Sequence, residues 1–190
     1  MIFFLPPAPH TAAFFDTIID ELGVGSAALT YPGYGEQSAI NASGIASYAK
    51  ALLEHFDELE KAILVGFHTG CLVGAEISKL LGDKCGRLIL IDVPNFDAAT
   101  REKYAAGMDK SDPKNAAFFA AFDYDCTVHF SSVTAPTTII ATQSFLFEPS
   151  KRAAELISHC DFVERRDISK PVFEAHSQAI AGEILRAASK

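Results

Sequence analysis

One histidine of this chain stands between two glycines, in the segment Gly66-Phe67-His68-Thr69-Gly70. An imidazole changes its charge near physiological pH, so such a side chain serves as a general base, a nucleophile or a hydrogen-bonding partner. Flanking glycines allow a strand and a helix to approach closely, and histidine tolerates a positive φ better than most residues. The pattern predicts a sharp turn with the His68 side chain at its tip.

The residues on either side of this turn have the character of a strand and a helix. Residues 62–65 (AILV) form a short apolar run that is typical of a buried parallel strand. Residues 71–81 predict a mostly buried helix, and Gly82 follows it as a stop signal. Cys71 opens this helix, where thiol pKa values fall, but we expect it to point into the helix packing as an inert thiol.

Strand-like and helix-like segments alternate along the rest of the chain. The expected strands are residues 2–5, 26–31, 87–91, 137–142 and 161–165, and the expected helices are residues 11–22, 45–59, 149–159 and 172–188. Such alternation predicts a parallel sheet with helices on both faces. Residues 95–132 interrupt the alternation with helical stretches such as 116–122, and we expect them to form a cap over the strand ends.

Several segments, in this order along the chain, resemble a known fold family. Residues 31–38 (YPGYGEQS) resemble the Pro-Gly-x-Gly-x-Ser turn of the α/β-hydrolase-fold proteins, and residues 66–70 are similar to their nucleophile elbow, Gly-x-nucleophile-x-Gly. Residues 88–92 (LILID) resemble the strand after the elbow helix, residues 135–140 (APTTII) the Pro-Thr strand, and residues 173–186 the last helix.

The resemblance covers nearly the whole chain and implies the fold. It implies a single α/β-hydrolase-like domain over residues 1–190, a three-layer sandwich of about six mostly parallel strands. Residues 95–132 would be its small helical cap insert. The chain starts at what would be the third strand of the family, so the first two strands would be missing.

The resemblance also implies three catalytic positions, and this chain departs from the family pattern at each of them. His68 occupies the nucleophile position. The acid position falls at Ser144 or Phe145, which are not carboxylates, and Glu148 is the nearest acid. Lys170 stands where the general-base histidine precedes the last helix. We therefore do not expect a serine-esterase mechanism, which needs all three groups.

Two of the candidate catalytic residues allow more than one interpretation. Asp92 ends the strand after the elbow helix, where lipase-like members of the family carry their acid, so a contact with His68 would give an oriented imidazole. Alternatively, Asp92 starts the following turn, a common place for aspartate. Lys170 either pairs with a carboxylate of the substrate or is a solvated lysine.

Backbone donors are a further candidate for ligand binding. The family's oxyanion hole uses the N–H after the nucleophile, here that of Thr69, and an N–H in the loop after the first strand. Pro6 and Pro7 occupy that loop and have no N–H, so Ala8 is the first possible donor. We expect Thr69 and Ala8 to form an oxyanion or ligand-binding spot.

Aromatic residues are frequent in and near the expected cap. We expect most of them to pack the cap onto the sheet and part of them to line an apolar pocket. The set consists of Phe118, Phe119, Phe122, Tyr124 and Phe130. Cys126 and His129 have a Cys-x-x-His spacing, but no second pair lies nearby, so we expect no metal site and no cofactor.

Composition limits the partners. A net charge of −8 argues against a nucleic-acid partner and against a basic membrane-binding face. The apolar start of five residues before Pro6 is too short for a signal or a membrane span. The four scattered cysteines favour a cytoplasmic protein with free thiols. An open sheet edge at residues 26–31 would allow a homodimer.

Two functions remain open from the sequence. The first is a catalytically degenerate relative that binds a small molecule at the elbow, with non-standard or lost hydrolase activity. The second is an active small-molecule hydrolase or lyase in which His68 acts as general base or nucleophile. Fold alone does not choose between them, because function depends on the site.

Overall fold

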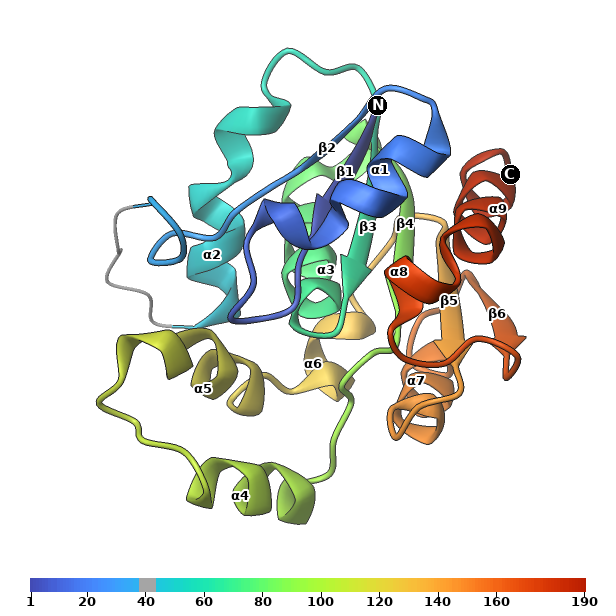
Figure 1. Ribbon diagram of the computed structural model, residues 1–190. Coiled ribbons are helices and arrows are strands. Elements are labelled where there is room, and N and C mark those ends of the chain that lie inside the picture. Colours follow the sequence, from blue (N-terminus) through green and yellow to red (C-terminus); the bar gives the residue numbers. More distant parts are fainter. Residues whose placement is uncertain (38–43) are drawn as a thin grey trace.

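A parallel sheet forms the centre of the molecule (Figure 1). The computed structural model describes residues 1–37 and 44–190. Ser38, the last residue of the turn-like segment 31–38, therefore lies outside the described residues. Six strands pair in the order β2-β1-β3-β4-β5-β6, every pair parallel. They are β1 (Ile2–Leu5), β2 (Ser26–Ala28), β3 (Ala62–Phe67), β4 (Cys85–Ile91), β5 (Thr137–Thr142) and β6 (Cys160–Arg165).

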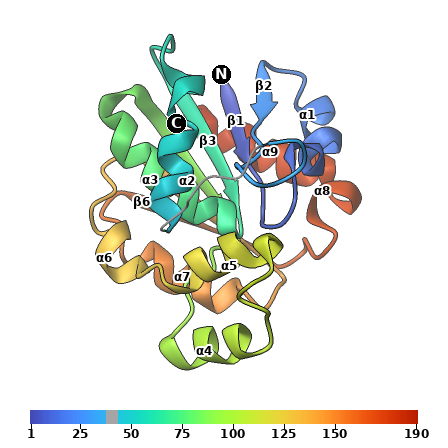
Figure 2. The same ribbon diagram turned by 90° about the vertical axis from the view of Figure 1, so that its left-hand side faces the viewer.

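Helices cover both faces of the sheet, as the two ribbon views show (Figures 1 and 2). Helices α2 (Ile45–Ala51), α3 (Thr69–Leu81) and α7 (Phe147–Ala154) lie on one face, and α1 (Asp16–Leu22), α8 (Val172–Ala175) and α9 (Ser177–Ala188) on the other. Strand β1 alternates between the two layers: Phe3 and Leu5 join one core cluster, while Ile2 and Phe4 join the other. The fold is therefore the expected three-layer sandwich.

Residues 95–132 hold α4 (Ala98–Ala106), α5 (Ala116–Phe122) and α6 (Cys126–Phe130), between β4 and β5 in the chain. These helices lie together below the sheet in Figure 1, at the end where β3 finishes. Functional groups of parallel α/β sheets gather at this end of the strands. The helical content expected for this segment is confirmed, including the bounds of α5.

Several predicted elements are shorter or broken in the structure. The predicted strand 26–31 ends at Ala28, because Tyr31 turns into the core, where its hydroxyl donates to the Pro6 carbonyl over 2.7 Å. The predicted helix 11–22 begins with a 3₁₀ turn at Ala12–Phe15, and helix 45–59 ends at Ala51 before a second 3₁₀ turn. The predicted last helix is interrupted at His176, which separates α8 from α9.

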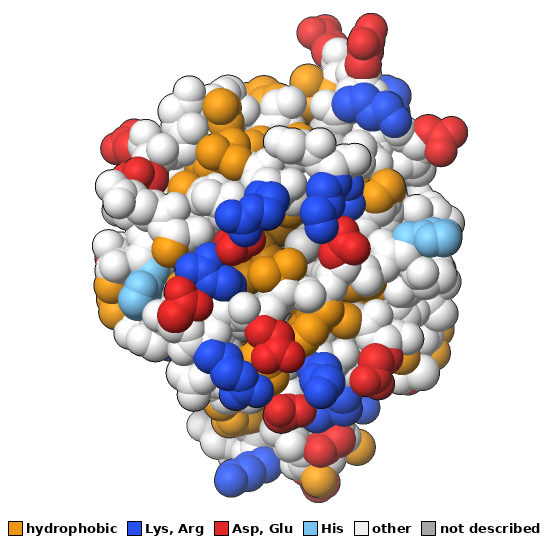
Figure 3. Space-filling model, turned by 90° about the vertical axis from the view of Figure 1, so that its right-hand side faces the viewer, with side chains coloured by type: hydrophobic (Ala, Val, Ile, Leu, Met, Phe, Trp, Pro, Cys, Tyr) orange, Lys and Arg blue, Asp and Glu red, His pale blue; other side chains and the backbone are white. Residues whose placement is uncertain are grey.

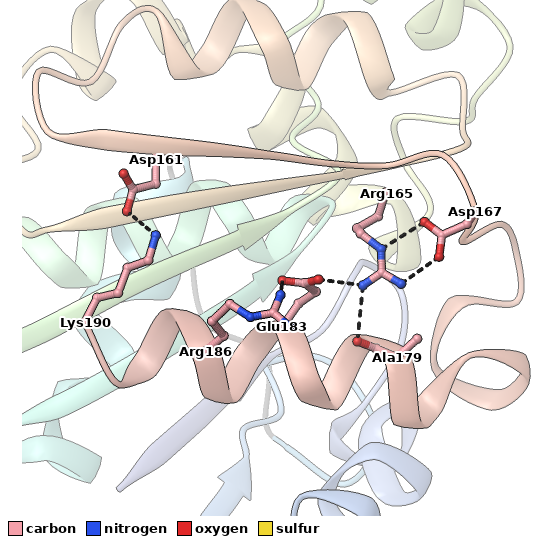
Figure 4. Close-up of polar contacts among 7 residues, drawn as sticks. All are labelled: Asp161, Arg165, Asp167, Ala179, Glu183, Arg186 and Lys190. Atoms are coloured by element: carbon pink, nitrogen blue, oxygen red, sulfur yellow. Dashed lines mark hydrogen bonds and ion pairs between the residues drawn. The ribbon is translucent and has the colours of Figure 1, made fainter.

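Strand β6 lies at one edge of the sheet and is surrounded by charged side chains of both signs (Figure 3). Arg165 donates to Asp167 and to Glu183, each over 2.7 Å, and Arg186 pairs with the same Glu183 (Figure 4). These ion pairs connect β6 to α9 and place charge at an edge that would otherwise be a template for association.

Strand β2 is the opposite edge and has three half-buried residues. Pairing of two chains across it stays a prediction. Within the described residues, no helix has the length and apolar character needed to span a bilayer, and the cytoplasmic location stays a prediction. All four cysteines are unpaired thiols.

Candidate functional site

The turn between β3 and α3 has the sharp geometry predicted from the sequence. His68 has a φ of 50° and a ψ of −117°, and its N–H donates to the Ile91 carbonyl over 3.2 Å. A Cβ atom on Gly66 would lie 2.4 Å from the Gly70 carbonyl oxygen, and one on Gly70 would lie 1.9 Å from the Leu5 carbonyl oxygen. Both glycines are therefore required by close backbone contacts, and the turn prediction is confirmed.

His68 borders two cavities and is held against aromatic rings. Its ring centre lies 4.0 Å from that of Phe67 and 6.5 Å from that of Phe145. Its Nε2 atom is buried without a hydrogen-bond partner in the structure. Burial lowers the pKa of His68 to about 3, and the positive charge of Lys170 and the proximity of His10 act in the same direction. At neutral pH the imidazole is uncharged.

The first cavity is apolar and has a volume of about 240 Å³. Its polar lining side chains are few, because aromatic and aliphatic groups from α4, α5 and the chain after β5 form most of the wall. The lining consists of His68, Thr69, Pro94, Phe96, Tyr104, Met108, Phe118, Ala121, Phe122, Phe145 and Leu146. Such a wall fits an apolar body with a polar group near His68.

The second cavity also borders His68 and is larger, at about 470 Å³. It shares His68 and Phe118 with the first cavity. Unlike the first, it contains several ionisable side chains in addition to His68, namely those of His10, Lys170 and Glu174. His68 therefore lies at the junction of an apolar cavity and a second cavity whose wall includes ionisable side chains.

Asp92 is fully buried and does not orient His68. Its carboxylate accepts two hydrogen bonds from Thr142, one from the N–H over 2.8 Å and one from the hydroxyl over 2.6 Å. Burial raises the pKa of Asp92, and the bonds from Thr142 oppose that shift. Asp92 also has a positive φ of 54°. The carboxylate thus ties the end of β4 to the end of β5.

The positions where the resemblance implies a catalytic acid and a catalytic histidine are occupied by residues of other types. Phe145 is 59% exposed at the rim of the first cavity, and Glu148 is exposed on α7. The Lys170 ammonium lies 5.2 Å from the centre of the Phe145 ring, a cation–π distance. Lys170 is exposed and lines the second cavity, so the structure brings it to the same cavity as His68.

The two predicted backbone donors are not brought to one cavity. Thr69 is the first residue of α3, where N–H groups have no partner within the helix, and it lines the first cavity. Ala8 lines the second cavity. Cys71, by contrast, donates its S–H toward the carbonyls of Gly66 and Ile91, and burial raises its pKa, as expected for an inert thiol.

The expected cap aromatics divide into two roles. Tyr124 and Phe130 are buried in the core cluster, whereas Phe118 and Phe122 line the first cavity. Both roles were expected, whereas Phe96, Tyr104 and Phe145 are cavity residues that no sequence pattern indicates. The only sequence signal for them is their position after β4, within residues 95–132, or after β5.

A cluster of charged and polar side chains around the buried Glu76 links α3 to residues 95–132, and no sequence motif indicates it. Glu76 on α3 is 7% exposed and accepts a hydrogen bond from the Tyr124 hydroxyl over 2.8 Å. His129 Nδ1 lies 2.9 Å from the same Glu76 oxygen, and Lys79 completes the cluster. His129 therefore serves this cluster, and Cys126 is buried. Among the described residues, no group of three or more His, Cys, Asp and Glu side chains is arranged for a metal ion.

Comparison with known proteins identifies the fold. No protein-family model matches the sequence, and no curated protein matches it either. Among solved structures, a hydrolase from Pseudomonas aeruginosa superposes with a TM-score of 0.83 at 16% identity, over 100% of this chain and 89% of that one. The enol-lactonase from Burkholderia xenovorans gives 0.77 at 13% identity, over 100% and 91% of the two chains.

An α/β hydrolase from Sphaerobacter thermophilus matches with a TM-score of 0.70 at 13% identity, over 97% of this chain and 91% of that one. With the parallel six-stranded sheet and the turn at His68, these matches show that the chain has the α/β-hydrolase fold. At such low identity they establish the architecture, and the chemistry has to be argued from the residues of this chain.

Proposed function

We propose that this protein binds a small apolar molecule at the elbow and has no serine-hydrolase type of activity. The observation that carries the proposal is the buried, unpartnered Nε2 atom of a neutral His68 that lines both cavities. A buried polar atom without a partner costs free energy, which a ligand with a hydrogen-bonding group removes. Residues 95–132 act as the cap that forms most of the apolar wall.

Loss of the catalytic groups supports binding over hydrolysis. A nucleophilic or general-base histidine needs an orienting acceptor, and the nearby carboxylate of Asp92 is engaged by Thr142. A pKa of about 3 also makes the His68 imidazole a weak base. We propose that His68 acts as an uncharged donor or acceptor for the ligand, and that Lys170 is a binding residue rather than a general base.

The proposal is tested by binding and turnover measured side by side. Wild-type protein is expected to enhance the fluorescence of N-phenylnaphthylamine, an uncharged apolar probe, and octanol is expected to displace it. Ala121→Phe fills the first cavity and is expected to weaken probe binding at least about tenfold. The matched control is Ala106→Phe on α4, at an exposed alanine outside the cavity lining.

The same preparations are assayed for hydrolysis of p-nitrophenyl butyrate. We expect no turnover that depends on His68, so the wild type and His68→Ala should have equal background rates. Robust turnover that is lost in His68→Ala would instead establish an active enzyme with His68 in the mechanism and would refute the proposal. Probe binding unaffected by Ala121→Phe would remove the first cavity from it.

A further inference from the structure

The two cavities at His68 differ in character, and the difference points to a class of ligand. The first cavity is almost entirely apolar, and the second contains Lys170, His10 and Glu174. Because His68 and Phe118 line both, the two cavities are neighbours at the elbow, and a ligand that extends from the first along His68 would enter the second. Such a ligand would have an apolar body at one end and a charged or polar group at the other.

Lys170 is the cation placed to receive that group. Its ammonium lies over the Phe145 ring, 5.2 Å from the ring centre, and Phe145 is at the rim of the first cavity. Lys170 therefore lines the second cavity, close to the point where Phe145 of the first cavity approaches it. Among the described residues Lys170 has no ion pair, unlike Arg165 or Lys79, whose charges are paired.

We propose that the ligand is an apolar monocarboxylate, with its hydrocarbon part in the first cavity and its carboxylate beside Lys170 in the second. The inference rests on the proposed function and specifies the ligand class for that same site. One oxygen of that carboxylate would accept a hydrogen bond from the Nε2–H of the neutral His68 imidazole, while the carboxylate faces the Lys170 ammonium. A carboxylate paired with an ammonium makes a charge-assisted hydrogen bond, which is stronger than a neutral one.

Glu174 allows the sign of the ligand's charge to be tested. It lines the second cavity and follows Lys170 by four residues in the sequence, on α8. Its carboxylate therefore opposes an anionic ligand and would favour a cationic one. Both side chains are exposed, so each effect is reduced by solvent. If the ligand is a carboxylate, removal of the two charges must change its affinity in opposite directions.

The experiment compares octanoate and octanol, which share the same apolar body, by displacement of N-phenylnaphthylamine at low ionic strength. The readout is the ratio of the two affinities. Lys170→Met is expected to lower the octanoate-to-octanol ratio by up to about fivefold, and Lys170→Arg, which keeps the charge, to restore most of it. Glu174→Gln is expected to raise the ratio. The control Lys50→Met makes the same change in net charge on α2, away from both cavities.

Two results would overturn the inference. One is a ratio that is the same in the wild type, Lys170→Met and Lys50→Met. The other is octylammonium binding more tightly than octanoate and losing affinity in Glu174→Gln, which would assign a cationic ligand. In either case displacement by octanol would leave the proposed function standing. If neither compound displaces the probe and the probe itself does not bind, the proposed function fails together with the inference.

Discussion

Gly70→Ala is expected to lower the free energy of unfolding by about 3 kcal/mol or more, because overpacking against backbone leaves no side chain free to move aside. The new Cβ atom would lie 1.9 Å from the Leu5 carbonyl oxygen, so α3 would have to shift away from β1. Urea denaturation followed by circular dichroism measures the change. Since the turn presents His68, probe binding should be lost together with stability.

Gly182→Ala is the matched control for this prediction. Gly182 lies inside α9, and no atom is within 4 Å of the position where its Cβ atom would be. Alanine is the better helix former, so this variant is expected to gain about 0.5–1 kcal/mol. An unfolding midpoint of Gly70→Ala equal to that of the wild type would contradict the close contact between the elbow and β1.

His68 is expected to make the folded state sensitive to acid. Its pKa is about 3 in the folded protein and near 6.5 in an unfolded chain. The unfolded state therefore binds a proton that the folded state does not, and stability is lost as the pH falls from about 6.5 toward 3. Between about pH 7 and pH 4 the loss from this group is on the order of 3 kcal/mol.

His68→Asn isolates this contribution, since asparagine does not titrate and tolerates a positive φ. Free energies of unfolding are measured across the pH range for both proteins. The wild type should lose about 3 kcal/mol more than the variant on acidification to about pH 4. Parallel pH profiles for the two proteins would mean that His68 titrates near its ordinary pKa and is not desolvated.

Much of the fold follows from local sequence patterns. Strands β1 and β5 have the predicted bounds, and the order of strands and helices agrees throughout the described residues. These are short apolar runs between turn residues, where the pattern itself decides the structure. One error accompanies a tertiary contact, because the short β2 strand occurs with the bond of the Tyr31 hydroxyl to Pro6. The other is the interruption of the last helix at His176, where the backbone leaves the helical conformation with a φ of −129°.

The candidate site was predictable only in part. The strand–turn–helix pattern placed His68 at the tip, and residue identities alone showed that the chain departs from the family pattern at three positions. The hydrogen-bond partner of Asp92 was not predictable, because a carboxylate at a strand end can accept hydrogen bonds from a turn, a histidine or a neighbouring strand. Its partner, Thr142, comes from β5, fifty residues later in the chain.

The cavities depend on still longer-range packing. Phe145 follows β5, Tyr104 is on α4 and Phe118 is on α5, and they meet only once residues 95–132 fold over the strand ends. Aromatic side chains in a sequence mostly indicate a core. Their place at a cavity follows from tertiary structure, in which Glu76 anchors the segment through Tyr124 and His129.

The most direct test of a neutral, ligand-binding His68 is an NMR titration with octanol at about pH 5, in which the imidazole nitrogen resonances of His68 are observed. We predict a neutral imidazole throughout, as a pKa of about 3 requires, and a saturable shift of the Nε2 resonance as the ligand provides its missing hydrogen bond. A charged His68 at this pH, or an Nε2 resonance that saturating octanol leaves unchanged, would contradict the account.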